Sequence, residues 1–220
     1  MQKFATTAPI AARLTVPAGR VQLIAADRTD ATVEVRPANP SRGRDVKAAD
    51  KVTVTYADGV LDVVDAEGGK AFGASGAVEV TVQLPAGSRV EVRAEATEVR
   101  AVGRLGDLTV TGAYQHIKID EAASVDLTAT DGDVEIGRIT GPANVTTARG
   151  SITVAEAAGG TVTLTTQMGD ITVAAAAGVS AALDAGTSHG RIANSLKNDG
   201  TPVLNIRATT AQGDITARSL

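Results

Sequence analysis

The sequence predicts an all-β protein: an elongated stack of two-stranded rungs of the β-solenoid or β-roll type, with a less regular, β-sandwich-like amino-terminal portion. Three observations predict this class. A glycine that opens a short alternating strand recurs at Gly132, Gly150, Gly169, Gly190 and Gly213. A second alternating strand precedes each of these glycines. Hydrophobic residues make up 43% of the chain but aromatic residues only 2%, so the core must be aliphatic, which suits a thin β interior.

The amino-terminal portion, residues 1–95, is expected to contain strands near residues 12–16, 20–26, 31–36, 51–56, 60–64, 77–84 and 88–94. The stretch VTVTYADGVLDVV, residues 52–64, is typical of a hairpin. A Pro-Ala-Gly corner occurs at residues 17–19 and again at 85–87, which indicates one architectural turn used twice. Residues 37–50 form a polar loop in which only 42–50 could hold a short helix, and residues 65–76 form a glycine-rich loop.

The carboxy-terminal portion, residues 96–220, carries the repeat and is expected to be continuous with the first portion. Two and four residues after each repeat glycine the side chain is mostly aliphatic, as in Ile152 and Val154, and the residue between them is mostly polar. This period of two indicates half-buried strands. One rung buries too little apolar surface to fold alone, so successive rungs must stack and place Ile152 beside Ile171. Upstream, Val99, Leu108 and Ile117 mark single strands of the same stack.

The repeated G-[DS]-I-x-V blocks, the V-x-L-x-T strands before them, the Pro-Ala-Gly corners and the closing GDITARSL resemble a bacterial β-strand-repeat family known as "putative adhesin", a domain of unknown function. The resemblance covers essentially the whole chain and is strongest from Gly106 to Leu220. It implies the repeat fold and no catalytic signature. It also implies a role at the cell envelope or in sensing near stress-response systems.

Charge and composition exclude several classes of protein. The net charge is −4, and the nearest basic cluster, Arg36, Arg42, Arg44, Lys47 and Lys51, is interrupted by acidic residues, so a nucleic-acid partner is not expected. The absence of cysteine excludes disulfides and thiolate metal sites. No apolar run has the length of a signal peptide or a membrane span, so a cytoplasmic protein without an integral membrane segment is expected.

The repeat also contains columns of polar residues that could carry chemistry. Asp107, Asp133, Asp170 and Asp214 lie in or near the turns, where they are expected to stabilise backbone, with a weak Ca²⁺ site as the alternative. Thr147, Thr166, Thr187 and Thr210 have the phase of inward-facing residues and are expected to bond backbone. His116 and His189 are expected to face solvent at turns. No catalytic residue, metal ligand or cofactor is predicted, and no enzyme is expected.

Two regions are predicted to mediate interactions. Asn194 occupies a position that is aliphatic or Ala in the other rungs, and a loop follows it, so Asn194, Lys197, Asn198 and Asp199 form a candidate interaction loop. The sequence ends directly after its last repeat strand, and an uncovered rung exposes backbone and core. Self-association as a homo-oligomer is therefore expected there, through Ile215, Ala217, Arg218 and Leu220.

The function predicted from these observations is that of a non-enzymatic scaffold or interaction protein. Its long β faces would bind a protein partner or further copies of the chain. The alternative is a module that binds a glycan or a peptide in envelope-stress sensing or adhesion.

Overall fold

The structure, a computed structural model, describes residues 1–65 and 76–220; residues 66–75 of the expected glycine-rich loop lie outside the described residues. The described residues form one helix, α1 (Gly43–Lys51), and seventeen strands. The strands are β1 (Gln2–Ala5), β2 (Ala11–Ala26), β3 (Asp30–Pro37), β4 (Val52–Ala57), β5 (Val60–Asp65), β6 (Val78–Pro85), β7 (Arg89–Tyr114), β8 (Ile117–Asp131), β9 (Val134–Ile139), β10 (Ala143–Arg149), β11 (Ile152–Ala157), β12 (Gly160–Met168), β13 (Ile171–Ala175), β14 (Ala181–His189), β15 (Ile192–Ser195), β16 (Leu204–Gln212) and β17 (Ile215–Ser219).

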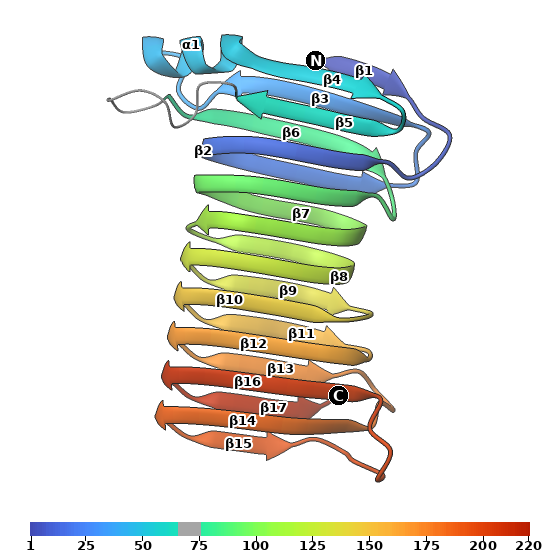
Figure 1. Ribbon diagram of the computed structural model, residues 1–220, viewed down its shortest axis with the longest axis vertical. Helices are drawn as coiled ribbons and strands as arrows, with labels where there is room; N and C mark the ends of the chain where they lie inside the picture. The colour runs from blue at the N-terminus through green and yellow to red at the C-terminus, as the bar shows by residue number, and fades with distance from the viewer. Residues whose placement is uncertain (66–75) are drawn as a thin grey trace.

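The strands form two layers that face each other across an aliphatic core (Figure 1). The front layer contains β4, β5, the first half of β2, alternate segments of β7 and β8, and then β10, β12, β16 and β14. The back layer contains β1, β3, β6, the second half of β2, the remaining segments of β7 and β8, and then β9, β11, β13, β17 and β15. The long strands bend from one layer into the other. The predicted solenoid-like class is confirmed.

Residues one rung apart are neighbours, as the period requires. Ile152 of β11 pairs with Ile171 of β13 on one side and with Val134 of β9 on the other. Val99 pairs with Ile117 in the back layer, whereas Leu108 between them lies in the front layer and pairs with Val125. The nine-residue interval is therefore half a rung, and the eighteen-residue interval is a complete one.

The order of the last two rungs differs from the expected succession along the chain. β16 pairs with β12 on one side and with β14 on the other, and β17 likewise lies between β13 and β15. The rung formed by β16 and β17 is therefore interior, and the earlier rung formed by β14 and β15 ends the stack. The expectation that rungs stack strictly in chain order is wrong at this point.

Side-chain chemistry explains why the later rung occupies the interior. β16 and β17 direct Leu204, Ile206 and Ile215 into the core, where each is at most 1% exposed. The matching inward positions of β14 and β15 include Asn194, whose register partner is Ala217. An interior position would bury the amide of Asn194 among aliphatic groups, which is costly without a hydrogen-bond partner. The rung with the more complete apolar column is therefore the better one to bury on both sides.

The amino-terminal end of the stack is closed by irregular elements. The predicted hairpin forms between β4 and β5, with Asp58 and Gly59 at positive φ in its turn. The region that could hold a short helix, residues 42–50, forms α1, which packs against β3 and β6. Buried Asp45 of α1 accepts a hydrogen bond of 3.1 Å from the backbone N–H of Ala77. Strand β1 was not predicted, since four residues are too few to show a pattern.

Strand β7 runs without interruption across residue 95, where the two sequence portions meet. Its first half pairs in parallel with β2, and its second half pairs in parallel with β8. The irregular amino-terminal strands and the repeat therefore share the same layers.

Candidate interaction surfaces

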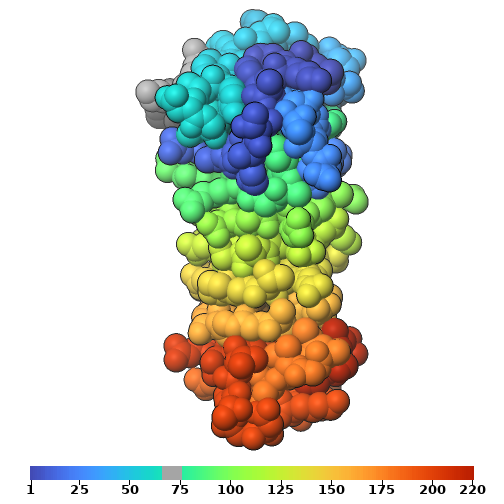
Figure 2. Space-filling model, turned by 90° about the vertical axis from the view of Figure 1, so that its right-hand side faces the viewer, coloured from blue at the N-terminus to red at the C-terminus, as the bar shows by residue number. Residues whose placement is uncertain are grey.

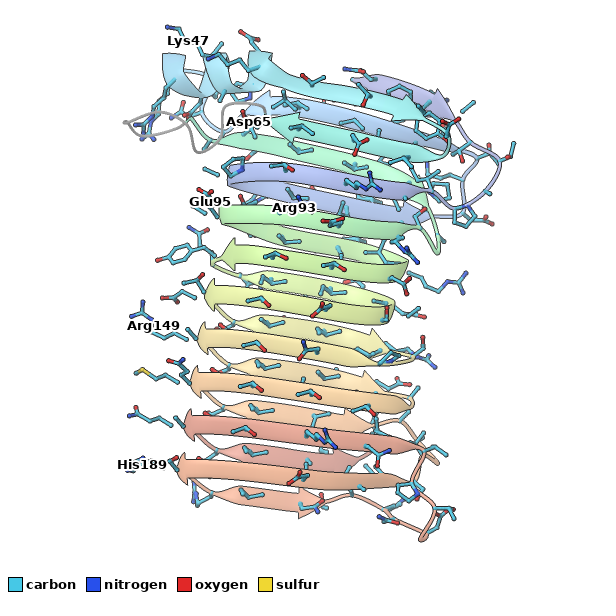
Figure 3. All side chains as sticks on the ribbon, viewed as in Figure 1. Lys47, Asp65, Arg93, Glu95, Arg149 and His189 are labelled. Atoms are coloured by element: carbon cyan, nitrogen blue, oxygen red, sulfur yellow. The ribbon has the colours of Figure 1, made fainter. Side chains whose placement is uncertain are left out.

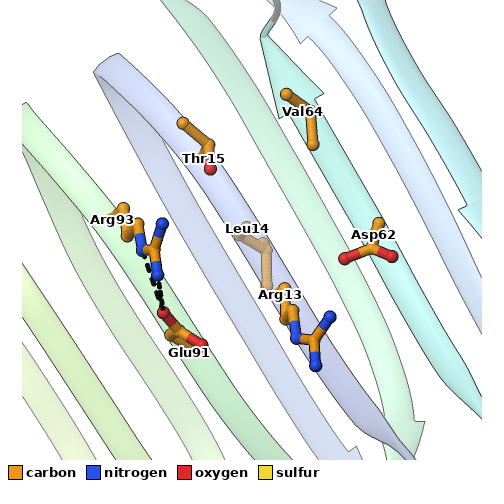
Figure 4. Close-up of a pocket in the computed structure, with 7 residues that line it drawn as sticks. All are labelled: Arg13, Leu14, Thr15, Asp62, Val64, Glu91 and Arg93. Carbon is orange, nitrogen blue, oxygen red and sulfur yellow. Dashed lines mark hydrogen bonds and ion pairs between the residues drawn. The ribbon is translucent and has the colours of Figure 1, made fainter.

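A charged hollow lies on the front face near the amino-terminal end, across β5, β2 and β7 (Figure 4). It has a volume of about 370 Å³. Strand register places Arg13 between Asp62 and Glu91, and Thr15 between Val64 and Arg93. The Arg93 Nε donates to Glu91 at 2.9 Å, whereas Arg13 has no ion-pair partner within the described part of the chain. The hollow therefore offers one unengaged guanidinium beside two carboxylates.

A ladder of outward-facing threonines continues along the front face below this hollow. Five successive strands contribute one threonine each, and each is the register partner of the next: Thr111, Thr128, Thr146, Thr165 and Thr209. Adjacent rungs of a sheet are ~4.8 Å apart, so the hydroxyls form a regular row. We call this row the front threonine ladder. This ladder was not predicted from the sequence, although the second x position of the V-x-L-x-T pattern is a threonine at Thr128, Thr146, Thr165 and Thr209.

A second row of polar side chains lies beside the ladder, two residues earlier on each strand. It contains Thr109, Asp126, Asn144, Thr163 and Arg207 in register. Asn144 Nδ2 donates to Asp126 at 3.1 Å. Part of this row lines a second hollow of about 390 Å³. The front face thus presents hydroxyl, amide and charged groups at fixed intervals along the stack.

The acidic turn column is a backbone-bonding ladder. Asp133 accepts from the N–H of Ser151 at 2.7 Å, Asp170 accepts from the N–H of Asp214 at 2.7 Å, and Asp214 accepts from the N–H of Arg191 at 2.8 Å. The backbone N–H of Arg191 and then its guanidinium hold the pKa of Asp214 below its usual range. These three carboxylates each join one turn to the next, as the turn-stabilising interpretation predicted. Asp107 differs, because it lies within β7 and accepts from the Ser124 hydroxyl at 2.7 Å and from the Arg89 guanidinium at 2.9 Å. Within residues 1–65 and 76–220, no three His, Asp or Glu side chains gather as a metal-binding group would.

The other members of the polar columns lie where their phase predicted. The hydroxyls of Thr166, Thr210 and Thr187 each donate at 3.0 Å to the turn carbonyl of the preceding rung in the stack. His189 and Arg149 extend from the turn edge into solvent (Figure 3). His116 lies 3.7 Å from the carboxylate of Glu135, which Lys118 contacts at 3.0 Å. No helix in the described part of the chain is long and apolar enough to cross a bilayer.

The predicted interaction loop is a strap that joins the last two rungs. The Asn194 Oδ1 accepts from the N–H of Leu196 at 3.0 Å, and the Lys197 carbonyl accepts from the N–H of Ala181 at 2.9 Å. Asn198 accepts from the N–H of Gly200 at 2.8 Å. Asp199 accepts from the Ser180 hydroxyl at 2.6 Å, which is the main reason that its pKa lies below the usual range. Local bonds therefore hold much of the loop.

The residues of the predicted self-association end do not lie together at an open edge. Ile215 and Ala217 are fully buried between β13 and β15, because the rung of β16 and β17 is interior. Arg218 and Leu220 are exposed, and the Leu220 N–H donates to the carbonyl of Ala175 at 3.0 Å. The open end of the stack belongs instead to β14 and β15, at the lower end of Figures 1 and 2.

Two facing layers of stacked, mostly parallel rungs define a β-solenoid-like protein with extended polar faces. The chain belongs to the Toastrack DUF4097 family, whose profile matches residues 13–219. The "putative adhesin" resemblance drawn from the repeated motifs is confirmed. No curated protein matches the chain.

Solved structures that resemble the chain cover almost all of it at low identity. A "putative adhesin" from Bacteroides fragilis shares 12% identity, with 98% of this chain and 95% of that chain covered and a TM-score of 0.47. A "putative cell adhesion protein" from Clostridium sporogenes shares 10% identity, with 100% and 98% covered and a TM-score of 0.43. A "putative adhesin" from Parabacteroides merdae shares 13% identity, with 100% and 93% covered and a TM-score of 0.42.

Proposed function

We propose that this protein is a non-enzymatic scaffold or interaction protein that binds a protein partner along its front face. The observation that carries the proposal is the front threonine ladder together with the polar row beside it. Both rows run over five strands in continuous register. Solenoids commonly use such extended faces for binding.

The chemistry of the rows suits an extended partner. Each threonine hydroxyl can donate one hydrogen bond and accept others, and the neighbouring row adds amide and charged groups. The side chains project from a rigid sheet, so little conformational entropy is lost when a partner binds. Because the rungs are ~4.8 Å apart, a partner in an extended conformation can repeat the same contact along the stack.

A capture experiment with paired surface variants tests this proposal. The chain is used as bait in extracts of its own organism, with a double variant Thr146→Arg/Thr165→Arg on the front face. The matched control is Thr153→Arg/Thr172→Arg, which changes two register-paired threonines on the back face. A specific partner should bind the unmodified chain and the control but not the front variant. A partner lost equally from both variants, or bound equally by both, would contradict the proposal.

The charged hollow favours a second candidate, a module that binds a peptide or glycan in envelope-stress sensing or adhesion. Its volume of about 370 Å³ is large enough for part of a small ligand, and the guanidinium of Arg13 could receive a carboxylate. A thermal-shift screen of acidic peptides and uronate-containing glycans should then give a response that Arg13→Gln removes. A response that survives Arg13→Gln would exclude this hollow.

The cytoplasmic location expected from the sequence stays a prediction that cell fractionation can test. Recovery in the soluble interior of the cell would agree with it. Recovery in the envelope fraction would contradict it and would favour the sensing or adhesion alternative.

A further inference from the structure

The terminal rung of β14 and β15 leaves a cross-section of the core uncovered. Parallel register partners point to the same side of a sheet, so Ile192 belongs to the column of Ile215, and Leu183 belongs to the column of Ile206. Ile215 and Ile206 are at most 1% exposed, whereas Ile192 is 46% exposed. Leu183 is only half-buried. The aliphatic interior therefore meets solvent at this end.

Both strands of this rung also have a free backbone edge among the described strands. β14 pairs only with β16, and β15 pairs only with β17. The opposite edges carry N–H and C=O groups that can pair with another strand. The two edges run antiparallel to each other, because β14 leads into β15 through the turn at Gly190.

We propose that a second copy of this chain covers this end. The two copies are related by a two-fold axis that is perpendicular to the two layers and passes midway between their Asn194 residues, which we call an axis at Asn194. This inference rests on the proposed function, an interaction protein, and deepens it by naming one partner and one contact. The axis pairs the nine residues of β14 with β14 of the second copy, and it pairs β15 with β15 and the adjoining Leu196. An axis along the strands would instead pair nine residues with four and leave most of β14 open.

The register depends on which residue of β14 lies opposite which residue of β15, at the same position along the strand direction. Counting outward from the peptide bond between His189 and Gly190, Ala185 and Asn194 are each the fifth residue and both belong to inward-facing columns, so Ala185 lies across the rung from Asn194, and Leu183 lies across from Leu196. In an antiparallel pair, residues directly opposite each other point to the same side of the sheet, and neighbouring residues along a strand point to opposite sides. A two-fold axis must therefore place one residue opposite the same residue of the second copy, and not opposite its neighbour. The candidates are Asn194 and its two neighbours in β15.

Charge and hydrogen bonding select among these three registers. An axis through Ser195 also passes through Asp184, so two carboxylates would face each other, which is unfavourable. An axis through Ala193 places the Asn194 amide against the Ile192 side chain of the second copy, which leaves a polar group without a partner. An axis through Asn194 places the two Asn194 amides opposite each other and Ile192 opposite Leu196 of the second copy.

The amide of Asn194 is self-complementary across a two-fold axis. Its Oδ1 accepts from the N–H of Leu196 and retains a second lone pair. The Nδ2 of each copy can donate to that lone pair on the other copy. A single polar residue in an apolar contact is known to fix register and partner number in this way. Asn194, the polar residue in an otherwise apolar column, would thereby fix the register of the dimer.

Positive charges meet only at the rim of the contact. In this register Arg191 approaches Lys197 of the second copy, but its guanidinium is already bound to Asp214 at 3.1 Å. The expected contact is therefore apolar and hydrogen-bonded, with weak repulsion at the edge. Salt screens such repulsion, so higher ionic strength should leave the dimer intact or strengthen it.

Sedimentation velocity over a concentration series tests whether this end associates. The unmodified chain should show a reversible monomer–dimer equilibrium. Ile192→Lys should shift the midpoint at least tenfold higher in concentration. The matched control, Met168→Lys, changes another exposed apolar residue, 50% exposed on β12 away from the end of the stack, and should not shift the midpoint. A monomer at all concentrations, or equal effects of both variants, would overturn the proposal.

Cysteine substitution tests the register, because the chain contains no cysteine of its own. With the axis at Asn194, the two Cα atoms at this position lie ~4.5–5.5 Å apart, within the range of a disulfide. Asn194→Cys should therefore give a disulfide-linked dimer under mild oxidation. Ala193→Cys should not, since the Cα atoms of residue 193 in the two copies lie ~8 Å apart and their side chains point outward. Linkage through Ala193→Cys alone, or equally through both, would overturn the register.

The outcome is separable from that of the proposed function. Loss of partner capture by the front-face variant with an intact dimer would support both proposals. Capture that is insensitive to the front-face variant, together with an Asn194-linked dimer, would overturn the front-face proposal and support the end contact. A strict monomer that still captures a front-face partner would overturn only the end contact.

Discussion

Gly169 lies directly against Gly150 in the column of repeat turns: a Cβ atom on Gly169 would lie 2.1 Å from the Gly150 carbonyl oxygen. The φ of Gly169 is +150°, a value that residues with a side chain rarely adopt. The same approach joins Gly213 to Gly169. The repeat therefore needs glycine because successive turns pack backbone on backbone.

Gly169→Ala should lower the free energy of unfolding by roughly 2–4 kcal/mol, because the new methyl group must displace a backbone carbonyl and adopt a strained φ. Chemical denaturation monitored by circular dichroism measures the change. Gly186→Ala is the matched control, since nothing lies within 4 Å of a Cβ at that position. It should be neutral or slightly stabilising. Equal losses in both variants would contradict the stacking argument.

Thr166→Val should destabilise the protein by about 1 kcal/mol, because the buried hydroxyl donates to the Gly150 carbonyl at 3.0 Å and valine keeps only the shape. The neighbouring residue provides the control. Thr165→Val changes a side chain on the outer face of the same strand and should stay within ~0.5 kcal/mol. If Thr165→Val were the more damaging change, the assignment of inner and outer faces would be wrong.

Ile215→Ala and Ile192→Ala test the order of the last two rungs. Ile215 is fully buried in β17, so its truncation should cost ~2–5 kcal/mol. Ile192, 46% exposed at the end of the stack, should cost less than about 1 kcal/mol in the monomer. Both residues follow a repeat glycine by two positions, so their sequence contexts are equivalent. Denaturation of dilute protein should give this ranking, and the reverse ranking would indicate a stack in chain order.

Asp30→Asn should reduce the loss of stability at acid pH. Hydrogen bonds from Arg28 at 2.6 Å and Lys3 at 2.8 Å lower the pKa of Asp30 from 3.8 to about 2. A lowered folded-state pKa contributes stability above the unfolded value, and that stability is lost as the pH falls from about 4 toward 2. Thermal melts between pH 5 and 2 should therefore slope less steeply in the variant. An unchanged slope would mean that the carboxylate contributes nothing across this window.

The parts of the fold that sequence reasoning predicted are those fixed by local pattern. The alternation around Ile152 and Ile171 specifies which side chains face inward, and the interval specifies which residues meet. The inward phase of Thr166 follows from the same count. The helix at α1 and the hairpin after Tyr56 depend on a few adjacent residues. In each case a short stretch of chain contains the information.

The order of the last rungs could not be predicted in this way, because all rungs carry the same pattern and could pair with any other. The choice depends on a comparison of distant side chains: Asn194 and Ala181 in one rung against their register partners Ala217 and Leu204 in the other. Asn194 is an exception in its aliphatic column, and its position in the end rung of the stack accounts for the exception. The front threonine ladder was not predicted, because outward-facing threonines form a row only once the register of neighbouring strands is known.

The interior position of β16 and β17 has a consequence for synthesis on the ribosome. Residues 181–195 leave the exit tunnel before residues 204–219, yet they dock only on the rung that those later residues form. In the nascent chain, β14 and β15 must therefore remain undocked until β16 and β17 emerge, or they must pair transiently with β12 and β13 and then dissociate. Translation speed over residues 181–219 should influence how much of the protein reaches the native order.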